Sequence, residues 1–157
     1  MALKTTQECY SNDWKRTNPD FAVYLPKEPS YHPEAVDHFL VDYTPGGDLL
    51  AIMTIATRLV GVDYSVISTR SEDGGITWSS PILIDGAGPN PGHVSAFGFP
   101  IISRSGRIYC FYHKGYGVGS GAQQFNLQCK YSDDDGYTWQ DGGVDIPFRR
   151  SQFDHPD

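Results

Sequence analysis

The sequence lacks long apolar segments. No hydrophobic run approaches the roughly 20 residues that a membrane-spanning helix needs, so we expect no membrane partner. The first residues, MALKTTQECYSNDW, also lack the apolar stretch of a secretion signal. The chain as written is therefore expected to be cytoplasmic, with a secreted or periplasmic location left open if the protein is processed.

Basic residues are few. Twelve Lys and Arg residues stand against 19 Asp and Glu residues, which gives a net charge of −7. Because proteins hold nucleic-acid phosphates with clustered Lys and Arg, this balance argues against a nucleic-acid partner.

Cysteine is scarce as well. Cys9, Cys110 and Cys129 are the three cysteines, and none lies in a CxxC spacing. We expect free thiols, although Cys110 and Cys129 fall on neighbouring predicted strands, where a disulfide stays open as an alternative. The five histidines are dispersed along the chain. We therefore predict neither a metal site nor a cofactor.

Glycine, proline and aromatic residues are plentiful. The 17 glycines and 11 prolines are spread along the chain, and 39% of the residues are hydrophobic. This composition favours a folded chain of short strands and tight turns over long helices or disorder. The fold class predicted from composition is therefore all-β.

One motif occurs twice. SEDGGITW at 71–78 recurs as SDDDGYTW at 132–139, 61 residues later (132 against 71). Both copies read Ser-x-Asp-x-Gly-x-Thr-Trp, an order that chance rarely repeats. The similarity extends upstream, where residues 39–54 align with residues 98–113. Each copy predicts four antiparallel strands, the content of one β-propeller blade.

The expected strand bounds follow from the apolar runs and the turn residues between them. The strands of the first copy are predicted at 38–44, 48–55, 64–70 and 79–84, and those of the second at 96–103, 107–113, 125–131 and 143–148. The chain then divides into an extended N-terminal segment, two blades and the start of a linker, with bounds 1–35, 36–90, 91–148 and 149–157. We expect the N-terminal segment to be a lead-in strand or a tie to the last blade.

The repeated motif has a structural explanation. Its Ser and Asp side chains can accept hydrogen bonds from backbone amides within a turn, and its Gly allows a positive φ. Its Trp can then bury a large ring between sheets. The acidic run 133–135 looks like a calcium or catalytic cluster, but the turn explains it better. We assign structural roles to Ser71, Asp73, Gly75, Trp78, Ser132, Asp134, Gly136 and Trp139.

At these motifs the chain resembles the sialidase (neuraminidase) superfamily, whose Asp-box or BNR repeats build six-bladed β-propellers. The resemblance covers roughly residues 36–148. It implies that this chain supplies about two to two and a half four-stranded blades, which leaves strand edges unpaired. A second chain, further copies of this chain or a missing C-terminal part would supply the remaining blades, and the ending FRRSQFDHPD favours the last of these.

Blade topology places the motif turns at one end of the sheets and the openings of the first strands at the other, which we call the mouth end. Concave mouths with convergent polar groups are the usual ligand sites. A lone His or Asp at a strand end is more often a cap or a solvated residue. The candidate substrate-binding residues are Asp37, His38, Arg58, Lys114, Tyr116, Arg149 and Arg150, and the candidate acid–base residues are His93 and His113.

Comparison with the sialidase superfamily adds one candidate catalytic residue and argues against one substrate. The stretch VDYSVISTRSEDGG resembles the family segment that carries an acid/base aspartate, which falls on Asp63. The family's Arg-Ile-Pro motif is replaced by VDHFLVDYTPGG, with Asp37 or His38 at the arginine position. This departure argues against sialic acid itself as the substrate.

Three functions follow. The leading one is a sialidase-like exo-glycoside hydrolase acting on an acidic sugar or polysaccharide, with Asp63 as acid or base and Arg58 holding the sugar. It needs groups from later blades, so the chain alone is expected to be inactive. The second is a polysaccharide lyase on uronate-containing glycans, with His93 facing His113 and Tyr116 as proton donor. The third is a noncatalytic carbohydrate-binding or scaffold propeller, in which Trp14, Tyr24 or Tyr116 would stack on sugars.

Overall fold

The structure is a computed structural model, and it describes residues 35–56, 64–86, 93–116, 124–143 and 146. The predicted linker at 149–157 and, apart from Ala35, the predicted N-terminal segment lie outside these residues. The described residues contain no helical segment with the length and apolarity that crossing a membrane requires.

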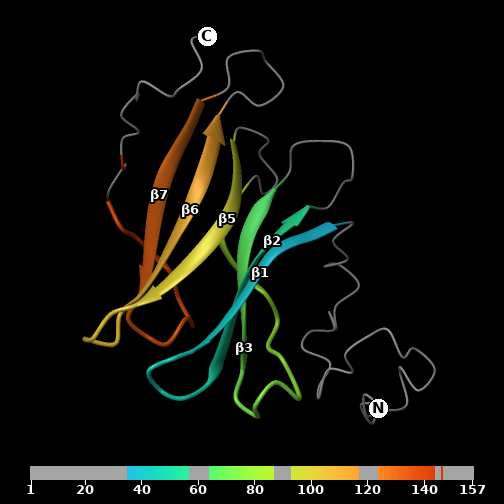
Figure 1. Cartoon of the computed structure of the whole chain (residues 1–157), viewed down its shortest axis with the longest axis vertical. Helices are drawn as coiled ribbons and strands as arrows, with labels where there is room; N and C mark the ends of the chain where they lie inside the picture. Colours follow the sequence, from blue (N-terminus) through green and yellow to red (C-terminus); the bar gives the residue numbers. More distant parts are fainter. Residues whose placement is uncertain (1–34, 57–63, 87–92, 117–123, 144–145, 147–157) are drawn as a thin grey trace, which may run out of the picture.

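Two four-stranded antiparallel sheets make up the described chain (Figure 1). Sheet 1 has the strands β1 (Ala35–Tyr43), β2 (Leu49–Ala56), β3 (Ser65–Ser71) and β4 (Ile82–Gly86). Sheet 2 has the strands β5 (His93–Ile102), β6 (Ile108–Tyr116), β7 (Gln124–Ser132) and β8 (Gln140–Asp141). Each strand pairs with the next along the chain. The all-β prediction and the four strands per repeat are confirmed, whereas the described strands do not close into a ring, so the propeller stays a prediction.

The last strand of each sheet departs most from its predicted position. β4 begins at Ile82 instead of 79, because the Ser79 amide still donates to the Arg70 carbonyl at 2.8 Å within the turn. β8 covers 140–141 and so begins before the strand predicted at 143–148, of which residues 144, 145, 147 and 148 lie outside the described residues. Gly143 has a φ of 67°, which interrupts the strand before an isolated bridge joins Ile146 to Leu127.

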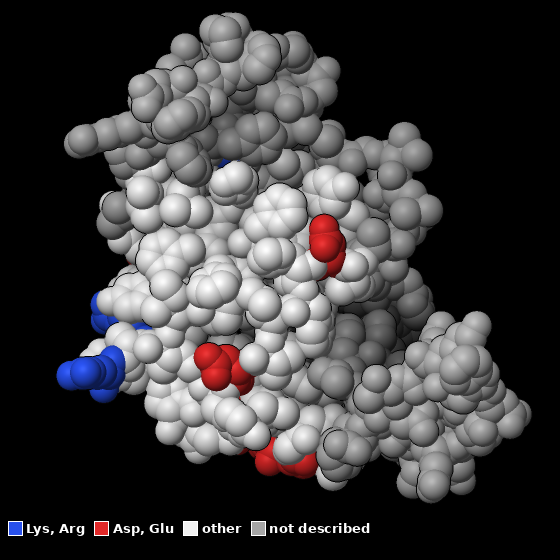
Figure 2. Space-filling model, in the orientation of Figure 1, with Lys and Arg blue, Asp and Glu red and all other residues white. Residues whose placement is uncertain are grey.

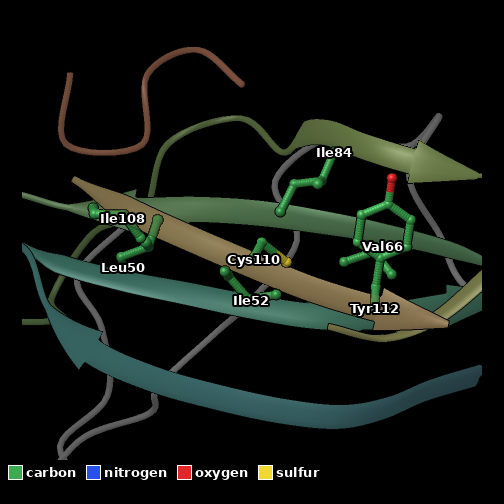
Figure 3. Close-up of a cluster of buried hydrophobic side chains, with 7 residues drawn as sticks. All are labelled: Leu50, Ile52, Val66, Ile84, Ile108, Cys110 and Tyr112. Carbon is green, nitrogen blue, oxygen red and sulfur yellow. The ribbon is translucent and has the colours of Figure 1, made fainter. Parts of the chain in front are cut away.

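The main core lies between the two sheets. Alternation along β2 points Leu50 and Ile52 toward sheet 2, where both are fully buried. Figure 3 shows them among the other members of this cluster, which are Val66, Ile84, Ile108, Cys110 and Tyr112. β5 contacts all four strands of sheet 1. The sheets therefore pack face to face, with β5 as the strand of sheet 2 that lies against sheet 1.

Gly98 makes this close approach possible. A Cβ atom at Gly98 would lie 2.5 Å from Val66 Cγ1 and 2.8 Å from Ile52 Cγ2, closer than van der Waals contact allows. Gly98 itself is buried. A glycine at this position of β5 therefore sets the distance between the sheets.

The outer faces of the two sheets differ. On sheet 1 the face turned away from sheet 2 carries a second buried cluster of Ala51, Met53, Ile55, Ile67 and Trp78. On sheet 2 the face of β5 that is turned away from sheet 1 carries the exposed residues Phe97, Phe99 and Ile101. The paired residues Phe111 and Cys129 lie on this outer face, because they alternate with inward-facing Cys110.

Cys110 and Cys129 therefore project from opposite faces of sheet 2. Both are buried free cysteines, as predicted, and burial raises the pKa of each thiol. Cys9, the third predicted free thiol, lies outside the described residues.

Candidate functional site

The two motif turns, residues 71–78 and 132–139, are here called the box turns. In the first, Ser71 Oγ accepts a hydrogen bond from the Gly75 amide at 2.7 Å and donates one to Asp73 at 2.8 Å. The Asp73 carboxylate accepts from the Thr77 amide at 2.8 Å and from the Thr77 hydroxyl at 2.5 Å. These bonds, led by that from the Thr77 hydroxyl, lower the pKa of Asp73 to about 2.

The second box turn repeats the pattern. Ser132 Oγ accepts from the Gly136 amide at 2.8 Å, and Asp134 accepts from the Thr138 amide at 2.8 Å and from its hydroxyl at 2.6 Å. Burial raises the pKa of Asp134, but the bonds from Thr138 and Ser132 outweigh it and lower the pKa. The Ser, Asp and Thr side chains of the motif are therefore used within the turn itself.

The remaining box residues pack as buried elements. Gly75 and Gly136 have φ values of 92° and 88°. Trp78 donates from Nε1 to the Gly75 carbonyl at 3.1 Å, and its ring joins the outer cluster of sheet 1. Trp139 donates from Nε1 to Ser68 Oγ of sheet 1 at 3.0 Å, which ties the two sheets together.

Asp133, in the acidic run within the second box turn, is paired with a residue outside the turn. Both carboxylate oxygens of Asp133 accept from Arg107, at 2.6 Å from Nε and 2.8 Å from Nη2. Within the part of the chain that the structure describes, no group of three or more His, Cys, Asp or Glu side chains is arranged to hold a metal ion. The box-turn end therefore presents structural carboxylates.

The mouth end is built by β-bulges in the first strand of each sheet. The register of β1 breaks between Asp37 and Leu40, and that of β5 breaks between Ala96 and Phe99. Within the bulges His38 has a φ of 54° and Phe97 a φ of 60°. Positive φ is unusual for residues other than glycine and, where it persists, often accompanies a functional site.

Neighbouring side chains hold both bulges in place. The Asp37 carboxylate accepts from the His38 amide at 2.7 Å. The hydroxyl of Thr54, a buried residue of sheet 1, accepts from the Phe97 amide at 2.8 Å. Asp37 thus acts as a backbone cap in the first bulge, and sheet 1 positions the second.

The bulges bring three rings together, which we call the aromatic cluster: His38, Phe97 and His113. The His38 and Phe97 rings meet edge to face, with centroids 5.3 Å apart, and the Phe97 and His113 centroids are 6.1 Å apart. Phe97 is 49% exposed. The structure therefore joins two predicted residues through a third that sequence reasoning missed. Phe97 aligns with His38, 59 residues earlier, and this alignment was the available signal that Phe97 lies at the mouth end.

A second group of polar residues lies between the sheets near the mouth end, and we call it the Asp85 cluster: Asp85, His93, Ser95, Lys114 and Lys130. Ser95 Oγ donates to Asp85 at 2.6 Å, and Lys114 Nζ lies 3.2 Å from the same carboxylate. Lys130 Nζ and His93 Nε2 each lie 3.7 Å from Asp85 Oδ1. Lys130 Nζ also donates to the Ile84 carbonyl at 2.5 Å.

The electrostatics of this cluster favour an ionised carboxylate. Burial raises the pKa of Asp85, but the Ser95 hydrogen bond and the charges of Lys114 and Lys130 outweigh it, so the pKa is lowered. Burial, together with the Asp85 charge, raises the pKa of the neighbouring Tyr112. The cluster therefore links two strands of sheet 2 to β4 of sheet 1 by charge.

The Asp85 cluster contains two residues that were predicted to act on a substrate. Lys114, predicted to bind substrate, and His93, predicted to be catalytic, both contact Asp85 in the interface between the sheets. Sequence reasoning missed Asp85, Ser95 and Lys130. Lys130 alternates with the outward-facing residues of β7, and this alternation was a usable signal that Lys130 points toward sheet 1.

The structure does not bring His93 and His113 together. His93 pairs with Tyr116 and Ala96 pairs with His113, which places the two histidines on opposite faces of sheet 2. Of Tyr116 only the backbone is described, paired with His93 and Gln124. The predicted residues Arg58, Asp63, Arg149 and Arg150 lie outside the described residues.

Comparisons with known proteins bear on the fold. No protein-family profile and no curated protein matches the chain. The structure is similar to that of the Hadza microbial sialidase Hz136, with a TM-score of 0.62 and 19% sequence identity, over 69% of this chain and 25% of that chain. It is also similar to a protein of unknown function from Dyadobacter fermentans DSM 18053, with a TM-score of 0.51 and 20% identity, over 67% of this chain and 35% of that chain.

The chain thus corresponds to about a quarter of the length of the first structure and about a third of the second. At such low identity the similarity concerns the fold alone. The two antiparallel sheets of this chain have a sialidase-like fold.

Proposed function

We propose that the chain is a portion of a sialidase-like glycoside hydrolase that acts on an acidic sugar or polysaccharide. The observation that carries this proposal is the pair of equivalent β-bulges in β1 and β5. They gather His38, Phe97 and His113 at the end of the sheets opposite the box turns. A sialidase-like fold with such a group at its mouth end supports a carbohydrate site there.

The chemistry of the aromatic cluster suits a sugar ring. The half-exposed Phe97 ring offers an apolar surface for the C–H groups of a sugar. The imidazoles of His38 and His113 can each donate or accept hydrogen bonds with hydroxyl groups. A protonated imidazole also attracts a sugar carboxylate. Asp63, from the family resemblance, completes the proposal as acid or base. Arg58, Arg149 and Arg150, from their predicted place at the mouth end, complete it as carboxylate ligands.

Further sheets are part of the proposal. Tyr109 and Phe111, on the outer face of sheet 2, align with Leu50 and Ile52, which carry the contact of sheet 1 with sheet 2. Sheet 2 thus turns outward the face that sheet 1 buries, and a head-to-tail contact of this kind can repeat until a ring closes. Figure 2 shows the described residues on the side viewed as mostly uncharged surface, with basic residues mainly at one edge. We propose that another four-stranded sheet covers the outer face of sheet 2, from a longer chain, a second chain or a further copy.

A noncatalytic carbohydrate-binding protein is the second candidate. Stacking and hydrogen bonding by the aromatic cluster are sufficient for binding a sugar. The Asp37 carboxylate accepts a backbone hydrogen bond in the first bulge, which gives it a structural role without catalysis. The lyase is less favoured, because His93 and His113 lie on opposite faces of sheet 2. Hydrolysis and binding are separated by measuring turnover and affinity on the same protein.

The binding experiment uses saturation-transfer NMR and calorimetry with a tetragalacturonate and lactose. We expect the tetragalacturonate, the acidic sugar, to bind more tightly than lactose. The variants His38→Ala, Phe97→Leu and His113→Ala should each weaken acidic-sugar binding by about tenfold, the loss of one good contact. Ile76→Ala, an exposed apolar residue of the first box turn, is the control and should leave affinity unchanged.

Turnover is measured by release of reducing ends from the same sugars, with the Asp63→Asn variant as the test of the acid or base. Release that depends on Asp63 supports the hydrolase. Binding by the aromatic cluster without release, in a protein extended by the further sheets, would leave the binding protein as the function. An unsaturated product absorbing in the near ultraviolet would show a lyase, and equal affinity in all three aromatic variants would refute the site.

A further inference from the structure

A cavity lies at the box-turn end, far from the aromatic cluster. Its volume is about 410 Å³, within the roughly 300–1,000 Å³ typical of small-molecule sites. The first box turn and the residues after it contribute Glu72, Trp78 and Ser79 to the wall, and Arg70 lies just before that turn. The second box turn contributes Tyr137. The cavity therefore exists only where the two sheets meet.

The Arg70 guanidinium is the buried polar group of this cavity. Arg70 is 4% exposed, and its Nη2 donates to Asp48 Oδ2 at 2.6 Å. Its Nε and Nη1 atoms are buried without a hydrogen-bond partner in the structure. A buried donor without a partner costs free energy, so the stability of the turn alone does not explain the position of Arg70.

Tyr137 covers this guanidinium. Its ring centroid lies 3.8 Å from Arg70 Cζ, a cation–π contact, and its hydroxyl donates to Glu72 Oε1 at 2.8 Å. Tyr137 is 52% exposed, so much of the side chain remains accessible to a ligand. The cavity thus combines an aromatic surface, a guanidinium and a carboxylate at one place.

The charges around the cavity select against an anion. Arg70 is the one cationic side chain among the described residues that line the cavity, and Asp48 already pairs with it. Glu72 adds a negative charge at the wall. A phosphate or carboxylate ligand would therefore meet a net negative surrounding, whereas a neutral hydroxyl group can donate a hydrogen bond to Glu72 without that repulsion.

The turn itself does not require this chemistry. At the equivalent positions of the other repeat, Arg70 aligns with Tyr131, Glu72 with Asp133, and Tyr137 with Ile76. Both box turns nevertheless form the same hydrogen bonds among their Ser, Asp and Thr residues. The cavity residues are therefore additional to the structural motif.

We propose that this cavity is a second carbohydrate-binding site, for neutral, hydroxyl-rich sugar units. A sugar stacks its C–H face on the side of the Tyr137 ring that is turned away from Arg70, and it donates a hydrogen bond to Glu72. The site goes beyond the proposed function, because it lies at the other end of the sheets and prefers uncharged units. It would hold a neutral part of a glycan while the mouth end meets an acidic one.

The test is calorimetry and saturation-transfer NMR of the protein with cellotetraose, maltotetraose and tetragalacturonate as probes. We expect at least one neutral tetrasaccharide to bind, and Tyr137→Ala to weaken it by at least about tenfold. Tyr137→Phe, which keeps the ring and loses the bond to Glu72, should have a smaller effect. Ile76→Ala, the same position of the other box turn, should have none, and circular dichroism checks that each variant is folded.

Three outcomes would overturn the proposal. The first is that neither neutral tetrasaccharide binds at concentrations up to about 10 mM. The second is that a neutral probe binds the Tyr137→Ala variant as tightly as the unchanged protein. The third is that His113→Ala removes neutral-sugar binding, which would place that sugar at the mouth end. Failure of acidic-sugar binding in the experiments above would leave this site standing, so the two proposals fail separately.

Discussion

The two ends of the sheets are built on different principles. At the box-turn end both repeats use the same residues for the same bonds, with Ser71 and Ser132 each accepting from a glycine amide at 2.7 and 2.8 Å. At the mouth end both repeats share a bulge but fill it differently, with His38 in one and Phe97 in the other. The Asp85 cluster has no counterpart among the other described residues.

The difference between the two ends separates residues that form the repeat from residues that can differ between its copies. Identity between the copies marks bonds that every sheet of this kind needs. Where the two copies share a backbone conformation but differ in residue type, the conformation does not require one particular side chain. Such a side chain is available for contact with a ligand. The same reasoning applies to Tyr137 and Ile76, which differ although the box turns share their Ser, Asp, Gly, Thr and Trp residues.

The largest expected effect is at the Asp85 cluster. Asp85→Asn should lower the free energy of unfolding by roughly 3 kcal/mol, because two lysines would remain in the interface without their carboxylate. Urea unfolding followed by circular dichroism measures it. Asp42→Asn, an exposed carboxylate on β1, is the control and should change stability by less than about 0.5 kcal/mol.

Acid titration sharpens this prediction. The pKa of Asp85 is lowered in the folded protein, so its stabilisation is present above the usual carboxyl pKa of about 4 and is lost as the pH falls through the lowered value. The stability difference between the unchanged protein and Asp85→Asn should therefore shrink as the solution is acidified. A difference that stays constant down to about pH 2 would contradict the ion pairs.

Packing between the sheets gives the next effect. Gly98→Ala should destabilise the protein by about 2 kcal/mol, because the new methyl group would overlap Val66. Adding Val66→Ala removes the shorter of the two contacts and leaves that with Ile52, so the double variant should still be more stable than the sum of the two single losses predicts. A double-mutant cycle measures this coupling, and strictly additive losses would show that Gly98 does not set the sheet distance.

The box turns should respond equally. Ser71→Ala and Ser132→Ala each leave a buried glycine amide without its acceptor, at a cost of about 1–2 kcal/mol. Urea unfolding should give values that agree within about 0.5 kcal/mol. A large loss in one turn with no change in the other would break the equivalence of the two repeats.

The smallest effect concerns one position where the turns differ. Asp135 has a φ of 56°, and Gly74 holds the equivalent place with a φ of 70°. Asp135→Gly should stabilise the protein by about 0.5 kcal/mol, because glycine adopts positive φ without the steric cost of a Cβ atom. Gly74→Asp should act in the opposite direction, and thermal unfolding that moves both variants the same way would refute the explanation.

Much of the fold could be predicted because its determinants are close in the sequence. The repeat spacing and the alternation of apolar residues gave the strands, and the motif residues gave the turn. The fourth strand of the second sheet was misplaced because Gly143 interrupts it. His38 and His113 were predicted for the mouth end, but Phe97, which joins them, was missed because nothing local reveals that a phenylalanine occupies a bulge with positive φ.

The sequence by itself determined the two box turns and the face of the sheet to which each strand residue points. Both depend on bonds and alternation within a few residues. Only the tertiary structure decided that Lys114 and His93 meet Asp85, and that Tyr137 covers Arg70. These contacts join different sheets, so they depend on how closely and in which register the sheets pack, and that is set by long-range contacts such as Gly98 against Val66.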